Sequence, residues 1–272
     1  MSPAALQGAT ATLLLTLAAR AEAGRVVAAS EFSDPEARRI AAALPFDLSA
    51  CARDEAFVRG VVLRAALIDR FAADFFAAHP LGMGITLGAG LCTRRSRLGL
   101  RGVDWLNIDL PDAIRLREQH VTRDEGERHL ACSILDLAWL DAAGLPGDRP
   151  VLVMLEGVCP YLPQAPLEAM LLCLAQRFER GRAACVVVLD YVHPILAGMP
   201  VQVGGVHLPV ASGFEDSACI AGIHSSIRVL SEDHLYARFS DQHRLFEAAF
   251  QATTGRWPYT VARFALGSPH DA

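Results

Sequence analysis

From Gly82 onward, short apolar runs alternate with stretches of helical periodicity, and this alternation constrains the fold more than any other feature of the chain. Strands separated by helices are typical of βαβ units, in which helices cover both faces of a parallel sheet. The sequence therefore predicts an α/β fold with a doubly wound, mostly parallel sheet. The expected strands are Gly84–Leu87, Val103–Ile108, His129–Ile134, Val151–Leu155 and Ala184–Leu189, and the expected helices between them are Pro111–Gln119, Trp139–Ala143 and Gln164–Arg180.

The segments on either side of this alternating region have a different texture. The first 80 residues read as helices, with a polar cap and proline at Ser33-Asp34-Pro35-Glu36 and helical periodicity from Asp54 to Ala78. His193–Ser226 is rich in glycine, proline and small residues, and it predicts an inserted cap over the carboxyl edge of the sheet. Helix is expected again over Glu232–Ala252, followed by a last strand over Thr260–Leu266.

The chain contains no lysine, so its 25 basic residues are all arginine. This excludes Schiff-base catalysis and the lysine-dependent phosphate sites of P-loop proteins and kinases. A net charge of -5, without a dense arginine run, argues against a nucleic-acid partner.

The cysteines and the apolar stretches indicate a cytoplasmic protein. The seven cysteines stand singly and show no spacing typical of metal ligands, so we expect reduced thiols and no metal site. Thr10–Ala19 is apolar, but it lacks the basic flank of a signal peptide and is followed by Arg20 and Glu22. No other stretch approaches the ~18 apolar residues of a membrane span. We therefore expect no membrane partner.

A glycine pair follows the first predicted strand, and an aspartate follows the second. Gly88 and Gly90 would let a ligand approach the backbone, although a tight structural turn is the alternative for these glycines alone. Asp109 lies about 20 residues further on, where a carboxylate can accept both hydroxyls of a ribose. The third glycine of GxGxxG is replaced by Thr93, which disfavours a pyrophosphate. The pattern favours a nucleoside ligand without phosphates, such as S-adenosylmethionine, over NAD or FAD.

Two more acids are expected at strand ends in the same sheet. Asp136 follows the apolar run Cys132–Leu135, and Glu156 follows Val151–Leu155. Because the carboxyl ends of parallel strands line one crevice, both should lie near Asp109. Helix capping or solvation in a loop is the alternative for any one of them.

Three motifs in this region resemble the leucine carboxyl methyltransferase family, which includes tetracenomycin-type polyketide O-methyltransferases. They are Leu87–Arg94 (LGAGLCTR), Asp109-Leu110-Pro111 and Glu156–Pro163 (EGVCPYLP), in an order and spacing typical of the family. The resemblance covers roughly Thr10 to Pro163. It implies a class I S-adenosylmethionine-dependent methyltransferase with a Rossmann-like fold, in which Cys92 stands where the family usually has aspartate.

The resemblance also implies roles for individual residues around the cofactor. Arg64 would clamp the methionine carboxylate, a task suited to a planar fork, with a salt bridge as the alternative reading and Arg20 as a second candidate. Glu156 would lie beside the methionine moiety. The remaining implied contacts are Gly88 and Gly90 along the cofactor, Asp109 at the ribose, and Asp136 with Leu137 at the adenine.

We expect an O-methyltransferase acting on a carboxylate or hydroxyl of a small-molecule or polyketide-like acceptor. A carboxylate needs no general base, whereas a hydroxyl does, and the candidates are Tyr161, Tyr191 and His193, with Tyr161 in a family motif. The alternatives are a nicotinamide-dependent oxidoreductase and a non-catalytic binding protein. The apolar first helix could support a homodimer contact.

The expected organisation is a single methyltransferase domain over residues 1–272. It comprises a helical N-terminal segment (1–80), a cofactor-binding core (81–190), a cap (191–231) and the C-terminal part of the core (232–272). The cap would decide which acceptor is used.

Overall fold

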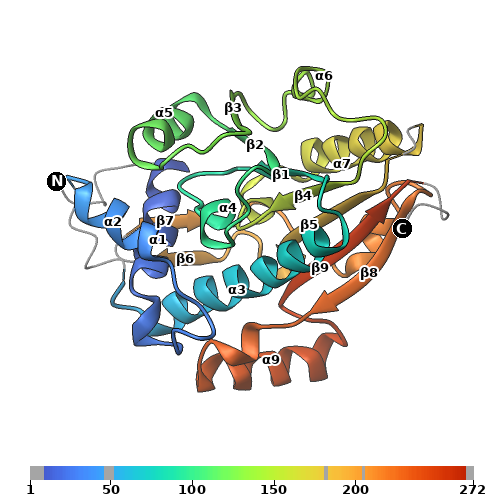
Figure 1. Cartoon of the computed structure of the whole chain (residues 1–272). Coiled ribbons are helices and arrows are strands. Elements are labelled where there is room, and N and C mark those ends of the chain that lie inside the picture. Colours follow the sequence, from blue (N-terminus) through green and yellow to red (C-terminus); the bar gives the residue numbers. More distant parts are fainter. Residues whose placement is uncertain (1–8, 46–51, 181–182, 204–205, 268–272) are drawn as a thin grey trace.

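Seven strands form one twisted sheet in the order β3-β2-β1-β4-β5-β9-β8 (Figure 1). The computed structural model describes residues 9–45, 52–180, 183–203 and 206–267. Strands β1 to β5 pair in parallel, β9 runs antiparallel to β5, and β8 runs antiparallel to β9. The predicted α/β fold with a mostly parallel sheet is thus confirmed. The strands of this sheet are β1 (Met83–Leu87), β2 (Asp104–Asp109), β3 (Glu127–Ala131), β4 (Val151–Leu155), β5 (Cys185–Val192), β8 (Ile227–Asp233) and β9 (Tyr259–Leu266).

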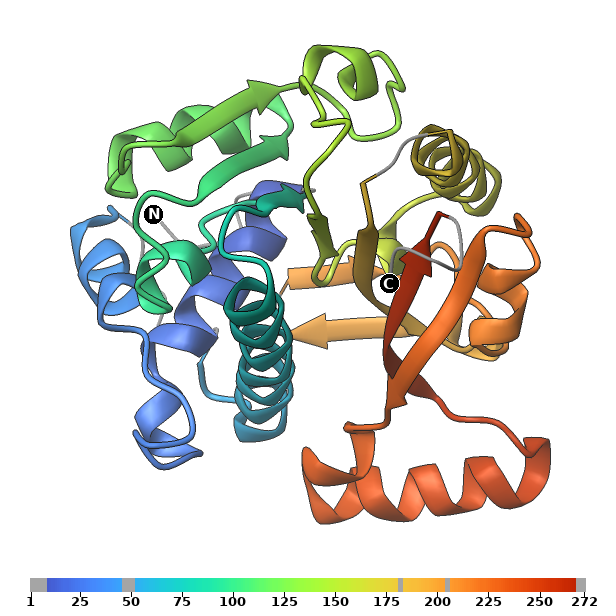
Figure 2. The ribbon, with the colours of Figure 1, turned by 45° about the vertical axis from the view of Figure 1, so that its right-hand side comes forward.

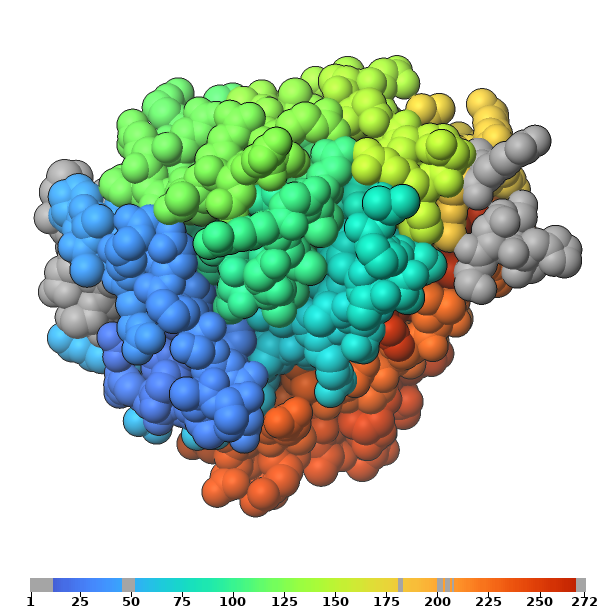
Figure 3. Space-filling view, in the orientation of Figure 1, coloured from blue at the N-terminus to red at the C-terminus, as the bar shows by residue number. Residues whose placement is uncertain are grey.

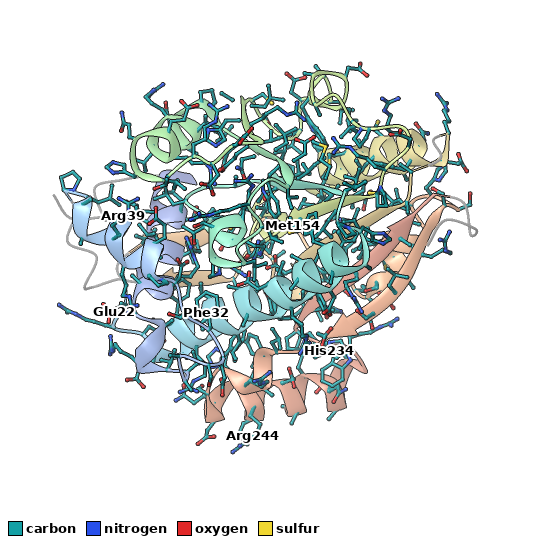
Figure 4. The ribbon with its side chains drawn as sticks, viewed as in Figure 1. Glu22, Phe32, Arg39, Met154, His234 and Arg244 are labelled. Atoms are coloured by element: carbon teal, nitrogen blue, oxygen red, sulfur yellow. The ribbon has the colours of Figure 1, made fainter. Side chains whose placement is uncertain are left out.

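Helices cover both faces of the sheet, which is why the central strands β1 and β4 are buried along their whole length. Helix α3 (Glu55–Ala78) covers one face and α7 (Gln164–Glu179) covers the other (Figure 2). Leu63 and Phe71 of α3 pack with Leu152 of β4, and Leu171 of α7 packs in the core on the other face. Met154, near the centre of Figure 4, is fully buried in β4. The other helices are α1 (Ala9–Ala21), α2 (Pro35–Ala43), α4 (Arg94–Arg97), α5 (Pro111–His120), α6 (Trp139–Ala142), α8 (Ser217–Ala221) and α9 (Asp241–Thr254), with 3-10 turns η2 (Ala23–Arg25), η3 (Cys159–Tyr161), η4 (Pro194–Leu196) and η5 (Tyr236–Arg238).

The helices of the N-terminal segment begin where the sequence predicts. The Asp34 carboxylate accepts a hydrogen bond from the Ala37 N–H at 2.9 Å, and Pro35 occupies the first turn of α2. Asp54 caps α3 in the same way through the Phe57 N–H at 3.0 Å. The caps satisfy amides that the helices leave unpaired.

The C-terminal part of the sheet corrects the sequence prediction. The predicted helix over Glu232–Ala252 was wrong at its start, because Ile227–Asp233 forms β8 and α9 begins only at Asp241. Strand β8 pairs with β9 across a bulge between Val229 and Ser231. This pairing partner lies far along the chain, so the local pattern does not reveal it. Strand β5 also continues to Val192, past the predicted end at Leu189.

The cap region contains η4, a two-stranded hairpin and α8. The hairpin, β6 (Pro200–Val203) and β7 (Val206–Pro209), packs Leu208 against Leu15 of α1. Its stem is fixed to η3 by a hydrogen bond from the Ala211 N–H to the Pro160 carbonyl at 2.7 Å. The N-terminal helix and the cap therefore meet beside the carboxyl edge of the sheet. Among the described residues, no helix has the length and apolarity needed to cross a bilayer.

Candidate functional site

A cavity of about 480 Å³ lies at the carboxyl edge of the parallel strands. Gly88 and Gly90 after β1, Asp109 at the end of β2 and Glu156 after β4 all line it. The expectation that these strand ends converge on one crevice is therefore confirmed for β1, β2 and β4.

The loop after β1 adopts a conformation that its glycines permit. Gly88 has φ +72° and Gly90 has φ +45°, in the left-handed region that other residues rarely adopt. A Cβ on Gly88 would also lie 2.4 Å from Cγ2 of Val158. The loop therefore exposes its backbone to the cavity, and any side chain at Gly88 would collide with Val158.

Asp109 ties this loop to β2 and keeps acceptor capacity for a ligand. One carboxylate oxygen accepts the Gly90 N–H and the other accepts the Leu110 N–H, both at 2.7 Å. Burial raises the pKa of Asp109, while these two N–H groups oppose the rise. Each oxygen of a carboxylate can accept a further hydrogen bond, so Asp109 can receive two hydroxyls from the cavity side.

Arg117 of α5 supports the glycine loop from below. Its NH1 donates to the carbonyls of Cys92 at 2.7 Å and Gly90 at 3.3 Å, and its NH2 donates to Glu127 at 2.8 Å. Burial alone would raise the pKa of Glu127, but the hydrogen bond from His129 and the charge of Arg117 lower it to about 2. The glycine loop is thus supported by the ion pair between Arg117 and Glu127.

Glu156 is the meeting point of two arginines at the floor of the cavity. Arg64 Nε lies 3.3 Å from one oxygen, and Arg94 NH2 donates to the other. Burial would raise the pKa of Glu156, but the charges of Arg94 and Arg64 bring it down to about 2. Glu156 is therefore ionised and oriented before any ligand arrives.

These contacts extend into a larger arrangement that we call the arginine lattice. Asp69 of α3 joins Arg94 to Arg97, and Asp34 joins Arg97 to Arg20 of α1. Figure 3 shows the blue N-terminal helices packed closely against the cyan and green segments, which include α3 and α4. Phe32, labelled in Figure 4, stacks under the Arg97 guanidinium at 4.9 Å. The lattice consists of Arg20, Arg64, Arg94, Arg97, Asp34, Asp69, Glu156 and Asp190.

Most residues predicted from the sequence line the cavity, and a few do not. Those on the lining are Arg20, Arg64, Gly88, Gly90, Asp109, Glu156 and Tyr161.

Asp136 and Leu137 lie outside the cavity lining. Asp136 is exposed, and its carboxylate caps the Ala138 N–H at 3.2 Å. The prediction that Asp136 closes a strand was wrong, because β3 ends at Ala131. Ser133 and Ile134, in the same turn, line the cavity instead.

Tyr191 and His193 are also turned away from the cavity. The Tyr191 hydroxyl pairs with Ser217 at 3.0 Å, and burial raises its pKa to about 12. His193 accepts the Ile195 N–H and stacks edge-on against Phe250. Of the three candidates for contact with the acceptor, only Tyr161 reaches the cavity.

Sequence reasoning missed several buried residues of the lattice, among them Arg94 and Asp190. Arg94 is fully buried although it stands in the charged run Arg94–Arg97. Asp190 ends the apolar run Cys185–Asp190, and a charge in such a run is a signal that could have found it.

One wall of the cavity is largely apolar. It is contributed by α1, α3, η3 with the residue that follows it, and the cap hairpin, so segments far apart in the sequence close over one space. Its side chains include Leu15, Phe57, Val61, Tyr161, Leu162 and Leu208. Among the described residues no cluster of histidine, cysteine and acidic side chains could hold a metal ion.

Comparisons with known proteins place relatives of this chain among methyltransferases. The family model described as leucine carboxyl methyltransferase matches residues 11–175. Tetracenomycin polyketide synthesis O-methyltransferase TcmP of Streptomyces glaucescens is 33% identical over 190 residues, which cover 70% of this chain and 68% of that protein. The S-adenosyl-L-methionine-dependent methyltransferase dpfgK of Gibberella zeae is 33% identical over 187 residues, covering 64% of this chain and 63% of that protein.

Among solved structures, human N-acetylserotonin methyltransferase in complex with SAM aligns over 86% of this chain and 57% of that chain, with 13% identity and a TM-score of 0.46. The family match spans more than half of the chain and includes the glycine loop, Asp109 and Glu156. The chain therefore belongs to the leucine carboxyl methyltransferase family of S-adenosylmethionine-dependent methyltransferases.

Proposed function

We propose that this enzyme transfers a methyl group to the oxygen of a small, largely apolar acceptor that is already ionised at neutral pH. A carboxylate on a polyketide-like body fits this description best, and an acidic hydroxyl is the second choice. The observation that carries the proposal is the cavity lining, which joins a polar, glycine-bearing side to an apolar wall without a free base.

The absence of a base follows from the described lining residues. They include no histidine, Glu156 is paired with two arginines, and Asp109 accepts two backbone N–H groups and is assigned to the ribose hydroxyls. Burial raises the pKa of Tyr161, so its phenol stays protonated and can only donate a hydrogen bond. A neutral alcohol would need a base to become a nucleophile, whereas a carboxylate would not.

The proposed cofactor contacts fit the residues present. Gly88 and Gly90 would pass along the cofactor, and the two oxygens of Asp109 would accept the ribose hydroxyls. Glu156 would face the cationic end, and Arg64 would hold the methionine carboxylate. Asp136 and Leu137 remain our proposal for the adenine, because the Asp136 N–H bonds Ser133, which lines the cavity.

When bound, S-adenosylmethionine supplies the methyl group on a sulfonium, a positive charge that disappears in the transfer. The chain's contribution is to orient the two reactants and to exclude water. Leu15, Phe57 and Leu208 exclude water from the acceptor side. The Tyr161 hydroxyl would donate to one acceptor oxygen and leave the other free to attack, and it is our candidate catalytic residue.

Other aspects of the proposal come from the whole chain. A single methyltransferase domain is supported by the sheet, which combines strands from Met83 to Leu266. All six cysteines in the described residues are free, which supports the cytoplasmic location that we propose. We also propose that the partner is a small molecule and not a nucleic acid, and that the first helix forms a homodimer contact.

Binding of S-adenosylhomocysteine by isothermal titration calorimetry tests the cofactor assignment. Asp109→Ala removes two hydrogen bonds to a charged acceptor, and we expect the affinity to fall at least about 100-fold. Asp112→Ala is the matched control, because Asp112 lies one turn away with its side chain 76% exposed. Unchanged affinity in Asp109→Ala would refute the assignment.

A labelled-methyl assay tests the acceptor class. We expect transfer to apolar carboxylic acids in preference to their amides and to neutral alcohols of the same body. If the enzyme preferred a neutral alcohol, the inference that the cavity lacks a general base would be wrong. Cofactor binding without transfer to any acceptor of these classes would instead favour a non-catalytic binding protein.

A further inference from the structure

Asp190 is a fully buried carboxylate on an apolar face of the sheet, and the proposed reaction gives it no direct role. It lies in β5 between Val188 and Val192, on the face covered by α3, and its exposure is 0%. It lies outside the cavity lining and beyond the residues matched by the family model. A buried charge is costly unless it is paired, so its partners should explain its presence.

Three donors converge on Asp190 from three different elements. The Gly157 N–H, after β4, donates to Oδ1 at 2.6 Å. Arg64 NH1 of α3 lies 3.3 Å from Oδ2, and the Tyr259 hydroxyl of β9 donates to Oδ2 at 3.0 Å. Arg64 and Gly157 both line the cavity, so Asp190 contacts the cavity wall from behind.

Tyr259 is placed for this contact by the antiparallel pairing of β5 and β9. Asp190 pairs with Val261 and Val192 pairs with Tyr259, which makes Asp190 and Tyr259 diagonal neighbours on one face. The Tyr259 side chain is also held in place by packing, since the centroid of its ring lies 5.9 Å from the ring centroid of Phe239. The hydroxyl therefore reaches Asp190 from a fixed direction.

Phe239 in turn packs against α3 beneath Arg64. A Cβ on Gly60 would lie 2.9 Å from the Phe239 ring, so the ring rests directly on the helix backbone. Gly60 and Arg64 are four residues apart and share one face of the helix. Tyr259 and Phe239 thus connect Asp190 to the helix that carries Arg64.

We propose that Asp190 and Tyr259 are positioning residues that aim the Arg64 guanidinium at the carboxylate of the cofactor's methionine group. This inference rests on the proposed function. Glu156 holds Arg64 at Nε and Asp190 holds it at NH1, each at 3.3 Å, so two carboxylates fix the guanidinium at two different nitrogens. A fork oriented before binding loses less freedom when it grips a ligand.

Two nucleoside ligands separate this role from a merely structural one. S-adenosylhomocysteine carries the amino-acid group that Arg64 would grip, and 5′-methylthioadenosine has the same nucleoside and sulfur without that group. In Tyr259→Phe, which removes one hydroxyl and keeps the ring, we expect about fivefold weaker binding of S-adenosylhomocysteine in calorimetry. Binding of 5′-methylthioadenosine should stay within about twofold of the wild type, because it makes no contact with Arg64.

Tyr191→Phe is the matched control. Tyr191 is adjacent to Asp190 in β5 and buried like Tyr259, but its hydroxyl bonds Ser217 on the opposite face. It should leave the affinities of both ligands unchanged.

The possible failures point to different errors. Equal weakening of both ligands in Tyr259→Phe, or no weakening of S-adenosylhomocysteine, overturns the positioning role while leaving the proposed function intact. A wild-type protein that binds neither nucleoside overturns the proposed function itself, and the positioning role with it.

Discussion

Replacing Arg94 with lysine should destabilise the protein although the charge is kept. The Arg94 side chain is fully buried, its Nε donates to Asp69 at 2.7 Å, and its NH2 donates to Glu156. Lysine offers a single ammonium on a flexible stem, which can reach one of these carboxylates but not both in this geometry. The second carboxylate then keeps its charge and loses a donor.

The size of the effect follows from the contacts that remain. A hydrogen bond to a charged group contributes about 1.5–3 kcal/mol, so losing one of two should lower the free energy of unfolding by about 2 kcal/mol. For a chain of this length, that corresponds to about 5 °C in the melting temperature. Arg94→Met removes the charge as well and should cost about 4 kcal/mol, because both carboxylates then depend on Arg97 and Arg64 alone.

Urea denaturation followed by circular dichroism measures these differences as shifts of the midpoint. Arg115→Lys is the matched control, since Arg115 pairs with Asp112 on the surface with 66% of its side chain exposed. It should change stability by less than about 0.5 kcal/mol. If Arg94→Lys unfolds at the same urea concentration as Arg115→Lys, the reasoning from the guanidinium fork is wrong.

Two further predictions concern the support of the glycine loop and the packing of β1. Because the pKa of Glu127 is lowered to about 2, its ion pair with Arg117 stabilises the protein above pH 4.5 and is lost as the pH falls through 2. As the pH is lowered, the free energy of unfolding of Glu127→Gln should therefore fall by about 3 kcal/mol less than that of the wild type. Equal slopes of the free energy of unfolding against pH for the two proteins, measured in denaturant titrations, would contradict this. Gly84→Ala places a Cβ 2.4 Å from the Trp105 ring and should cost about 1–3 kcal/mol in thermal unfolding. Gly147→Ala, with open space around it, should cost less than about 0.5 kcal/mol, and equal melting temperatures for these two variants would refute the packing argument.

The parts of the site that the sequence predicts are those with local signals. Gly88 and Gly90 directly follow an apolar run, and Asp109 and Glu156 directly follow two others. Parallel strands bring such positions to one edge, so no knowledge of distant contacts is needed to place them together.

Asp136 shows where a local signal misleads. The residues Cys132–Leu135 are apolar enough to extend the strand, yet β3 ends at Ala131. β3 is an edge strand, and its one neighbour, β2, ends at Asp109 opposite Ala131. Without a partner beyond that point, the backbone of the following residues cannot continue the ladder and turns instead.

The arginine lattice was beyond local reasoning for another reason. Arg94 is buried because Asp69 of α3 and Glu156 after β4 flank it, and neither is near it in sequence. Strand β8 is comparable, since its charged residues Glu232 and Asp233 resemble a helix start until β9 is placed beside them. Pairing over long sequence separations decides both features.

Arg20 has a consequence for the motion of the first helix. From α1 it donates to the Leu91 carbonyl at 2.8 Å and to Thr93 at 3.1 Å, so the helix is bonded to the same loop that carries Gly90. Lifting α1 from the body of the protein must break these bonds. A ligand that binds only the intact loop therefore also stabilises the packed position of α1. Because thermodynamic coupling is reciprocal, the factor by which the ligand slows amide hydrogen exchange in α1 equals the factor by which lifting the helix would weaken ligand binding.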